Sequence, residues 1–257
     1  MLILLPPSEG KTRPVDGAPL DLAALSFPRL TKVREQLVSS VVRLSGGRES
    51  RAMEVLGLGS TQADAVARNA RLREEPTAPA GEVYTGVLFG ALDLATLERD
   101  SRERADRVVA VASALFGLVR PTDPIPAYRL SGTVSLPRLG PVAGRWRDLL
   151  PRVLDDEVAD GLLVDLRSGT YVALGRPSPA LAPRTATLRV LHERDGTRSV
   201  VSHFNKATKG HIVRQLVGQD RVPGSVDDLT DLLGDLGWTV ERSGNRVDIV
   251  VTEVRTH

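Results

Sequence analysis

The sequence has no cysteine, few aromatic residues and no long hydrophobic run. The absence of cysteine excludes disulfides, thiol catalysis and cysteine-ligated zinc or iron–sulfur sites. No stretch approaches the roughly 20 apolar residues that a membrane-spanning helix needs. The apolar start Met1–Leu5 runs at once into two prolines, and it lacks the charged lead and long apolar core of a signal peptide. We therefore expect a cytoplasmic protein with no membrane partner.

Lysine is also scarce, because nearly all of the 34 basic residues are arginine. The lysines are Lys11, Lys32, Lys206 and Lys209. The formal charge of +2 and the pI of about 9.2 do not by themselves predict nucleic-acid binding. Arginine is a poor substitute where a compact charge or a titratable amine is needed, and three of the lysines lie in the segments described below. The histidines are too few and too isolated for a metal site, and we expect neither a metal nor a cofactor.

Apolar residues make up 41% of the 257 residues, which is enough for the core of one domain over residues 1–257, with a helical subdomain at 30–73. Strands are expected at 2–5, 107–114, 161–166 and 171–174, with hairpins at 188–192/199–204 and 238–242/246–251. Helices are expected at 30–44, 49–56, 61–73, 93–104, 147–159, 207–217 and 226–236. Interleaved helices and strands with several hairpins predict an α/β fold built on a mixed sheet.

The loop Pro6–Thr12 follows the first strand and offers Ser8, Glu9 and Lys11. A strand that runs into Gly-Lys-Thr invites comparison with a phosphate-binding loop. The Walker pattern needs a glycine where this chain has Leu5, so ATP binding of that type is not expected. Two interpretations stay open: a polar, anion-binding loop, or an ordinary turn with a solvated lysine.

A Gly-Leu-Gly turn between the helices expected at 49–56 and 61–73 matches the helix-hairpin-helix pattern. The turn residues are Gly57, Leu58, Gly59, Ser60 and Thr61. Two glycines permit a tight turn and let backbone N–H groups approach a phosphate, so such a module grips DNA without reading bases. Leu56 stands where a proline is usual, and Glu54 and Asp64 add negative charge. The alternative is a plain αα-hairpin.

Two further polar segments follow buried strands. In the first, prolines hold the chain extended after Arg120, which lowers the entropy cost of positioning functional side chains. A structural pair of Arg120 with Asp123 is the alternative interpretation. In the second, a polar run opens a helix that offers two lysines to an anion. We expect one cationic cleft lined by Ser8, Lys11, Arg120, Tyr128, Arg129, Ser202, Asn205, Lys206 and Lys209.

Four segments together resemble the YaaA family of peroxide-stress proteins. They are Met1–Thr12, Val83–Gly86, Leu115–Pro121 with Tyr128–Leu130, and Ser202–Gly210. The resemblance implies a single mixed α/β domain with a helix-hairpin-helix element and a positively charged cleft, and it adds Tyr84 to the cleft. It also implies DNA binding and a role in surviving hydrogen peroxide by limiting damage from unincorporated iron.

The chain departs from the family pattern in two places. Its start, Pro7–Lys11, is longer than the Pro-Ala-Lys form, and Asp165–Ser168 replaces a stretch of the Asn-Leu-Ala-Ser type. These departures are compatible with a branch whose task differs from the stress role.

Two functions are therefore expected. The first is non-specific binding of duplex DNA in the peroxide-stress response, through the hairpin and the basic cleft. The alternative is an enzyme that acts on a small anionic or nucleotide-like substrate, with Lys11, Lys206 or Lys209 as base or nucleophile. A structural or partner-binding role has no positive feature in the sequence behind it, and the sequence does not define the oligomeric state.

Overall fold

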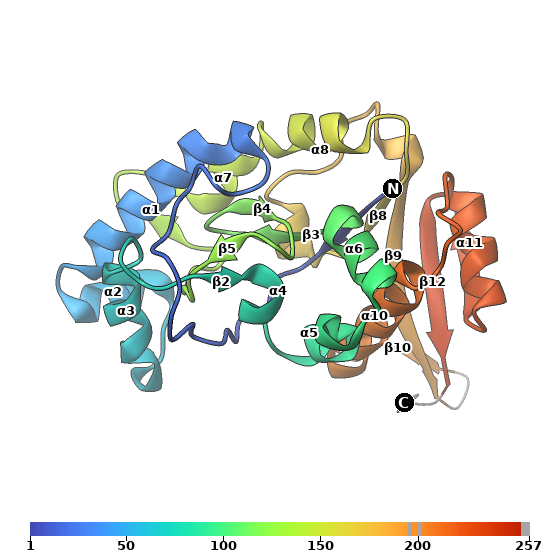
Figure 1. The fold of residues 1–257 in the computed structure, drawn as a ribbon, viewed down its shortest axis with the longest axis horizontal. Helices are drawn as coiled ribbons and strands as arrows, with labels where there is room; N and C mark the ends of the chain where they lie inside the picture. The colour runs from blue at the N-terminus through green and yellow to red at the C-terminus, as the bar shows by residue number, and fades with distance from the viewer. Residues whose placement is uncertain (195–196, 200–201, 253–257) are drawn as a thin grey trace.

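A mixed, mainly parallel sheet forms the centre of the computed structural model, which describes residues 1–194, 197–199 and 202–252 (Figure 1). Its strands are β1 (Leu2–Leu5), β3 (Val109–Ser113), β4 (Gly117–Val119), β8 (Leu163–Asp165), β9 (Thr185–Arg194), β10 (Thr197–Ser199), β11 (Thr239–Ser243) and β12 (Arg246–Val251). The order is β11-β12-β9-β8-β1-β3-β4, with β10 paired to β9. The pairs β3–β4, β9–β10 and β11–β12 are antiparallel and the others are parallel. The predicted mixed α/β fold is confirmed.

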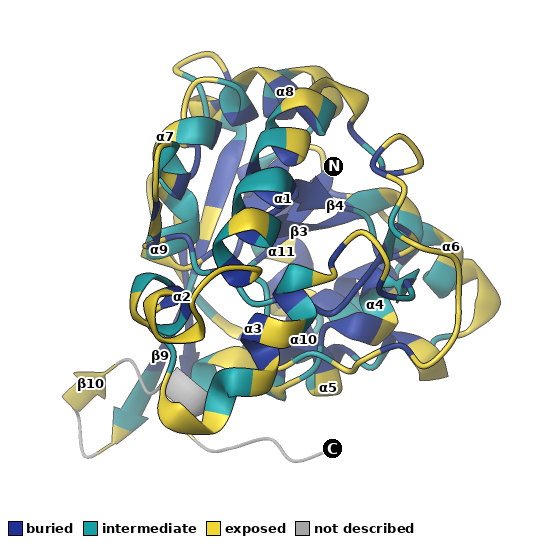
Figure 2. Ribbon diagram, turned by 90° about the vertical axis from the view of Figure 1, so that its left-hand side faces the viewer, coloured by how far each residue is buried: buried dark blue, intermediate teal, exposed yellow. Residues whose placement is uncertain are grey.

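The first strand lies in the middle of the core. β1 pairs in parallel with β3 on one side and β8 on the other, so that Ile3 lies opposite both Val109 and Val164. All four residues of β1 are buried, as Figure 2 shows for the strands at the centre of the molecule. A strand buried on both faces is expected to be apolar throughout rather than alternating, which explains the uninterrupted run at Leu2–Leu5.

Helices surround this sheet and gather into groups. Their bounds are α1 (Thr31–Ser45), α2 (Glu49–Leu56), α3 (Ala63–Ala70), α4 (Ala80–Val83), α5 (Val87–Leu92), α6 (Arg99–Val108), α7 (Val142–Trp146), α8 (Leu150–Val158), α9 (Gly169–Val172), α10 (Ser202–Val217) and α11 (Val226–Asp235). The helices α1, α2 and α3 pack on one another at one end of the molecule, within the range 30–73 (Figure 1). The subdomain boundary itself stays a prediction. Short strand pairs join β2 (Ala78–Pro79) to β5 (Pro124–Ile125) and β6 (Ser135–Leu136) to β7 (Gly140–Pro141).

The close crossing of α5 and α10 depends on a glycine. A Cβ atom at Gly210 would lie 2.3 Å from the carbonyl oxygen of Leu88 and 2.7 Å from Cβ of Ala91. Atoms never approach so closely, so only glycine allows these two backbones to meet at this distance. The crossing positions α10, which carries two of the four lysines.

An arginine joins α1 to the edge of the sheet. Arg34 is buried and donates hydrogen bonds to the carbonyl oxygens of Phe116 (2.9 Å), Leu118 (2.8 Å) and Ser26 (2.7 Å). Burial lowers the pKa of the guanidinium to about 10, so it remains charged at neutral pH. The buried face of α1 comprises Arg34, Leu37, Val38, Val41 and Ser45, so the arginine takes its place there beside apolar residues.

Three local predictions are wrong. The strand predicted at 171–174 falls on the end of helix α9 and the turn after it. The strand predicted to run to 204 ends at Ser199, since α10 begins at Ser202. The predicted helix 93–104 begins late, because α6 starts at Arg99. Short apolar runs do not distinguish helix from strand, so tertiary packing decides such segments. The predicted hairpin turn at 195–196 lies outside the described residues.

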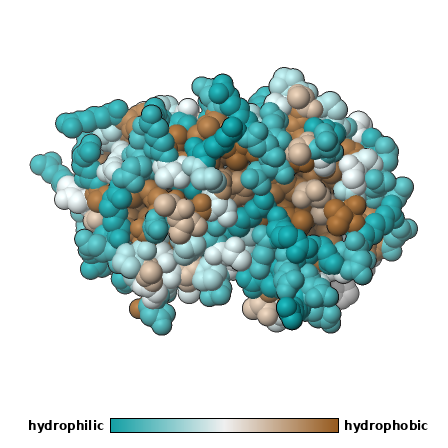
Figure 3. Space-filling view, turned by 45° about the horizontal axis from the view of Figure 1, so that its top comes forward, coloured by the Kyte–Doolittle hydropathy of each residue, from teal (hydrophilic) through white to brown (hydrophobic). Residues whose placement is uncertain are grey.

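Polar side chains dominate the rim of the surface seen in Figure 3, and apolar side chains show in a band through its middle. Among the residues that the structure describes, no helix is long and apolar enough to span a bilayer.

Candidate functional site

The carboxyl ends of three parallel strands define the site. β1, β3 and β8 end at Leu5, Ser113 and Asp165, so the segments that follow them emerge on one edge of the sheet. In open α/β sheets, ligands bind at this edge. Two cavities lie there, and the loop after β1 contributes Glu9 and Gly10 to both.

The hairpin cavity has a volume of about 470 Å³ and lies between the α2–α3 turn and the sheet edge. Its walls include Lys11, Thr61, Gln62, Arg68, Tyr128 and Arg129. The cavity therefore unites three segments that are far apart in the sequence, and all three were predicted as functional.

The lysine cavity has a volume of about 590 Å³ and lies between the same loop, α5 and α10. Its walls include Ser8, Thr85, Tyr171, Asn205, Lys206 and Lys209. The residues predicted for a single cleft therefore line two cavities that share Glu9 and Gly10 of the loop, and the predicted cleft residue Tyr84 is buried and lines neither.

Lys11 is held between the loop and two aromatic rings. Its backbone forms a β-bridge with Tyr84, and its Nζ donates a hydrogen bond to the carbonyl oxygen of Ser8 at 2.8 Å. The same Nζ lies 4.4 Å from the ring centroid of Tyr128 and 5.4 Å from that of Tyr84. Burial, and to a lesser extent the charge of Arg129, lowers the pKa of this amine to about 7, against a smaller opposing effect of Glu9.

The two tyrosines beneath Lys11 belong to a buried network. The hydroxyl oxygens of Tyr84 and Tyr128 lie 2.9 Å apart, and that of Tyr128 lies 2.7 Å from Oγ of Ser113. Ser113 Oγ in turn accepts hydrogen bonds from the N–H groups of Leu115 and Phe116. Burial raises the pKa of both phenols well above the ordinary value, so both rings stay neutral beneath the amine.

Arg129 is fixed by its main chain as well as its side chain. Its N–H donates to Oδ1 of Asn69, and its carbonyl oxygen accepts from Nδ2 of Asn69, at 3.0 and 2.8 Å. The guanidinium forms an ion pair with Glu9 at 3.0 Å. Asn69 was not predicted, because its burial is set by tertiary packing and the sequence shows only an asparagine three residues after Val66 on helix α3.

The lysine cavity contains amines of two kinds. Lys206 is exposed, whereas Nζ of Lys209 donates to the carbonyl oxygen of Leu166 at 2.9 Å. Burial lowers the pKa of Lys209, and the charge of Asp165 opposes that effect. Asp165 is itself buried and paired with Arg167 at 2.7 Å, so the departure from the family pattern at 165–168 forms a structural ion pair beside the cavity.

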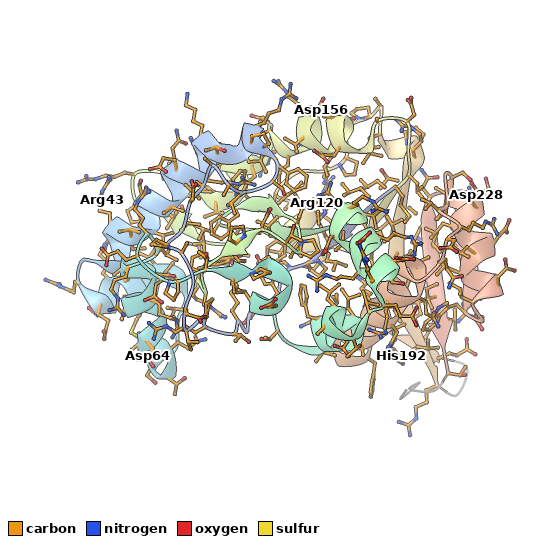
Figure 4. The ribbon with its side chains drawn as sticks, in the orientation of Figure 1. Arg43, Asp64, Arg120, Asp156, His192 and Asp228 are labelled. Carbon is orange, nitrogen blue, oxygen red and sulfur yellow. The ribbon has the colours of Figure 1, made fainter. Side chains whose placement is uncertain are left out.

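Arg120 does not line either cavity, and its prediction as a cleft residue is wrong. β4 runs antiparallel to β3, so the chain leaves it at the opposite edge of the sheet. There the guanidinium pairs with Glu157 at 2.8 Å and donates to the carbonyl oxygen of Val109, the first residue of β3. Figure 4 shows Arg120 toward α8, well away from Asp64 of the hairpin. The alternative pairing with Asp123 holds only for the backbone N–H of Arg120, at 2.9 Å.

The hairpin turn uses its own backbone donors. The N–H groups of Gly57, Leu58 and Gly59 donate to Glu54 O, Met53 O and Gln62 Oε1 at 3.2, 2.9 and 3.1 Å. Gly57 has a φ of 63°, so α2 ends in the left-handed conformation that favours glycine. Our expectation that these glycine N–H groups are free to meet a phosphate is therefore wrong. The following Ser60 lies at the turn, and Thr61 reaches the hairpin cavity.

Ser202, also predicted for the cleft, begins α10, but its side chain lies outside the described residues. Within those residues, no three histidine, aspartate or glutamate side chains are grouped to hold a metal ion.

The lowered pKa predicts the reactivity of Lys11. Only the neutral amine attacks an acylating reagent, so its labelling should be half-maximal near pH 7, whereas an ordinary lysine titrates at pH ~10.4. Between pH 7 and the ordinary pKa of lysine, the unfolded chain binds more protons at this residue than the folded chain does. Lys11 therefore makes folding more favourable as the pH rises through that range. Mass spectrometry of labelled peptides measures the midpoint, with the exposed Lys32 for comparison. A midpoint for Lys11 above pH 9 would contradict the prediction.

Comparison with known proteins places the chain among related sequences. A family described as peroxide stress protein YaaA matches residues 1–243. A UPF0246 protein of Streptomyces coelicolor is 48% identical over 261 residues, which cover 99% of this chain and 100% of the relative. UPF0246 proteins of Corynebacterium efficiens and Shewanella woodyi are 41% and 30% identical, over 99% and 84% of this chain and 100% and 86% of each relative. The match extends from the strand–loop start through the hairpin to α10, and the chain belongs to the YaaA family of peroxide-stress proteins.

Proposed function

We propose that the protein binds the phosphate backbone of duplex DNA along the hairpin cavity and the adjoining turn. The observation that carries the proposal is that Thr61 and Arg68 of the hairpin share one cavity with Lys11 and Arg129. A surface that collects cations from separate segments beside a helical hairpin suits a repeating anion better than an isolated one. We assign this binding to the peroxide-stress response on the family description alone.

Side chains rather than glycine N–H groups would make the phosphate contacts. The donors of the turn are already used internally, as described above, so the contacts fall to the hydroxyls of Ser60 and Thr61 and to the guanidinium groups of Arg68 and Arg129. Asp64 and Glu9 line the same cavity and limit its positive charge. The expected affinity is therefore moderate, sensitive to salt and indifferent to sequence.

Anisotropy of a labelled duplex, titrated at several salt concentrations, tests the proposal. Arg129→Ala and Arg68→Ala should each weaken binding about tenfold at low salt, because each removes a charge-assisted contact, and each should reduce the log–log salt slope by about 1. The Arg129 change leaves the main-chain contacts with Asn69 in place, so the fold should persist.

The matched control is Arg152→Ala, which removes an exposed arginine on α8. This helix precedes β8 and so lies at the opposite edge of the sheet (Figure 1). An equal loss of affinity in the control, or wild-type binding that hardly responds to salt, would refute DNA binding along the hairpin cavity.

A small anionic or nucleotide-like ligand in the lysine cavity is the second candidate. The observation in its favour is that Lys206 and Lys209 of α10 and Ser8 of the loop meet at a separate cavity of about 590 Å³. That volume suits a ligand of nucleotide size. In this interpretation the amines bind the anion, and the protein is an enzyme or a ligand-dependent regulator.

Thermal-shift measurements with nucleotides and phosphorylated metabolites test this candidate. A ligand at 100 times its Kd stabilises the native state by about 2.7 kcal/mol, which raises Tm by several degrees. Lys206→Ala should abolish that shift and leave DNA affinity unchanged, because Lys206 lies outside the hairpin cavity. A ligand shift that survives in the variant would exclude Lys206 from the binding site.

A further inference from the structure

Lys11 is a buried amine with a lowered pKa, a property that binding a phosphate does not require. A contact with the phosphate backbone of DNA needs a fixed positive charge, which any of the arginines in this chain would supply without burial. Lys11 is instead desolvated, and its pKa near 7 leaves about half of the amine uncharged at neutral pH. A desolvated lysine of this kind is suited to nucleophilic attack on a carbonyl group.

The lone pair of the neutral amine is not consumed by the neighbours that surround it. The carbonyl oxygen of Ser8 and the faces of the two tyrosine rings all act as acceptors toward Nζ. The hydroxyls of Tyr84 and Tyr128 bond to each other and to Ser113. The amine is thus oriented by groups that accept hydrogen bonds from its N–H groups, while its electron pair is left for a ligand in the cavity.

The residues that line the hairpin cavity indicate which kind of carbonyl compound would reach this amine. Arg68 and Arg129 line the same cavity, so phosphates on either side of a sugar would be held within reach of Lys11. A nucleotide that has lost its base exposes an aldehyde when its sugar ring opens, and it has no base that must be unstacked before it enters a protein cavity. The cavity of about 470 Å³ has room for such a pentose.

We propose that Lys11 forms a covalent imine with the ring-opened sugar aldehyde of an abasic site in duplex DNA. The inference rests on the proposed DNA binding and adds a chemical step to it. The lone pair of Nζ attacks the aldehyde carbon to form the C–N bond. The carbonyl oxygen leaves as water with the two protons that the amine loses, so no oxidant, reductant or metal takes part.

Trapping with cyanoborohydride tests this step, because the reagent reduces an imine to a stable secondary amine. A duplex with one abasic site is incubated with the full-length protein, and the adduct is quantified on a gel and located by peptide mass spectrometry. We expect an adduct on Lys11 that falls at least tenfold in Lys11→Arg, which keeps the charge and removes the nucleophile. Lys11→Ala is measured beside it in case the larger arginine does not fit over Tyr128. Lys32→Arg, at an exposed lysine that lines neither cavity, is the matched control and should keep the adduct.

A second duplex separates binding from chemistry. It contains a tetrahydrofuran analogue, which lacks the aldehyde, and anisotropy reports its affinity for each variant. No adduct with intact binding of this duplex would overturn the imine and leave the proposed function standing, whereas absence of binding would overturn both. An adduct on the α-amino group of Met1 or on Lys206 would assign the imine to another amine and overturn the role of Lys11. An adduct with free ribose 5-phosphate, and none with the abasic duplex, would assign it to a free sugar phosphate and overturn the inference for DNA.

Discussion

Replacement of Gly210 by alanine should destabilise the protein by about 3 kcal/mol, at the upper end of the usual cost of overpacking. The new Cβ would lie 2.3 Å from the carbonyl oxygen of Leu88 and 2.9 Å from the N atom of Leu92, and backbone atoms cannot move aside as the end of a flexible side chain can. The helices α5 and α10 must then separate, and both contribute walls to the lysine cavity. Thermal melting should show a fall in Tm of about 6–12 °C, as expected for a chain of this length.

Gly90→Ala on α5 is the matched control for this prediction. A Cβ at Gly90 would have no atom within 4 Å beyond the backbone of its own helix, so the substitution removes a helical glycine without a clash. It should stabilise the protein by about 0.5–1 kcal/mol, since alanine is the better helix former. If Gly210→Ala melts at the temperature of the wild type, the close crossing of the two helices described here is incorrect.

Arg34→Met should have a comparable or larger effect on stability. Three hydrogen bonds from a charged donor contribute ~1.5–3 kcal/mol each, and relief of the buried charge offsets part of their loss, which leaves a net cost of about 4 kcal/mol. The bonds join α1 to Phe116 and Leu118 at β4 and to the loop at Ser26, so their loss frees the edge of the sheet from the helix. Denaturant unfolding, analysed at constant slope, measures the change in free energy.

Two variants make this result interpretable. Lys32→Ala removes an exposed cation from the same helix and should change the stability by less than about 0.5 kcal/mol. Arg34→Lys keeps a charge but presents one ammonium in place of a planar fork, so its cost should lie between those of the other two variants. Equal stabilities for Arg34→Met and Lys32→Ala would show that the buried guanidinium does not hold α1 to β4.

The sequence was sufficient for most of the fold because the strong patterns were local. The continuous apolar run of β1, the glycine turn after α2 and the hairpin formed by β11 and β12 each predict their element without knowledge of their neighbours. The antiparallel strand β4 was not predicted. Its three residues follow β3 closely, and no periodicity in so short a segment reveals the reversal of direction.

The candidate site could be predicted in its components and not in its arrangement. Lys11, Arg129 and Lys209 were identified because polar residues follow buried strands, and the structure brings them to one edge of the sheet. Arg120 was misplaced for the reason that β4 was missed, since a single reversal moves a residue to the opposite edge. Asn69 was overlooked because its role is to hold the main chain of Arg129 across 60 positions, and such long-range contacts leave only a weak local signal.

The loop after β1 carries its own anion. The carboxylate of Glu9 is 85% exposed, pairs with Arg129 at 3.0 Å and borders both cavities. Any incoming anion must take the place of this resident carboxylate, so Glu9 competes with every ligand of Arg129. A monovalent ion gains little by the exchange, whereas a polyanion brings several phosphates to replace one carboxylate. The loop thus favours ligands that carry several linked phosphates over ligands that carry a single negative charge.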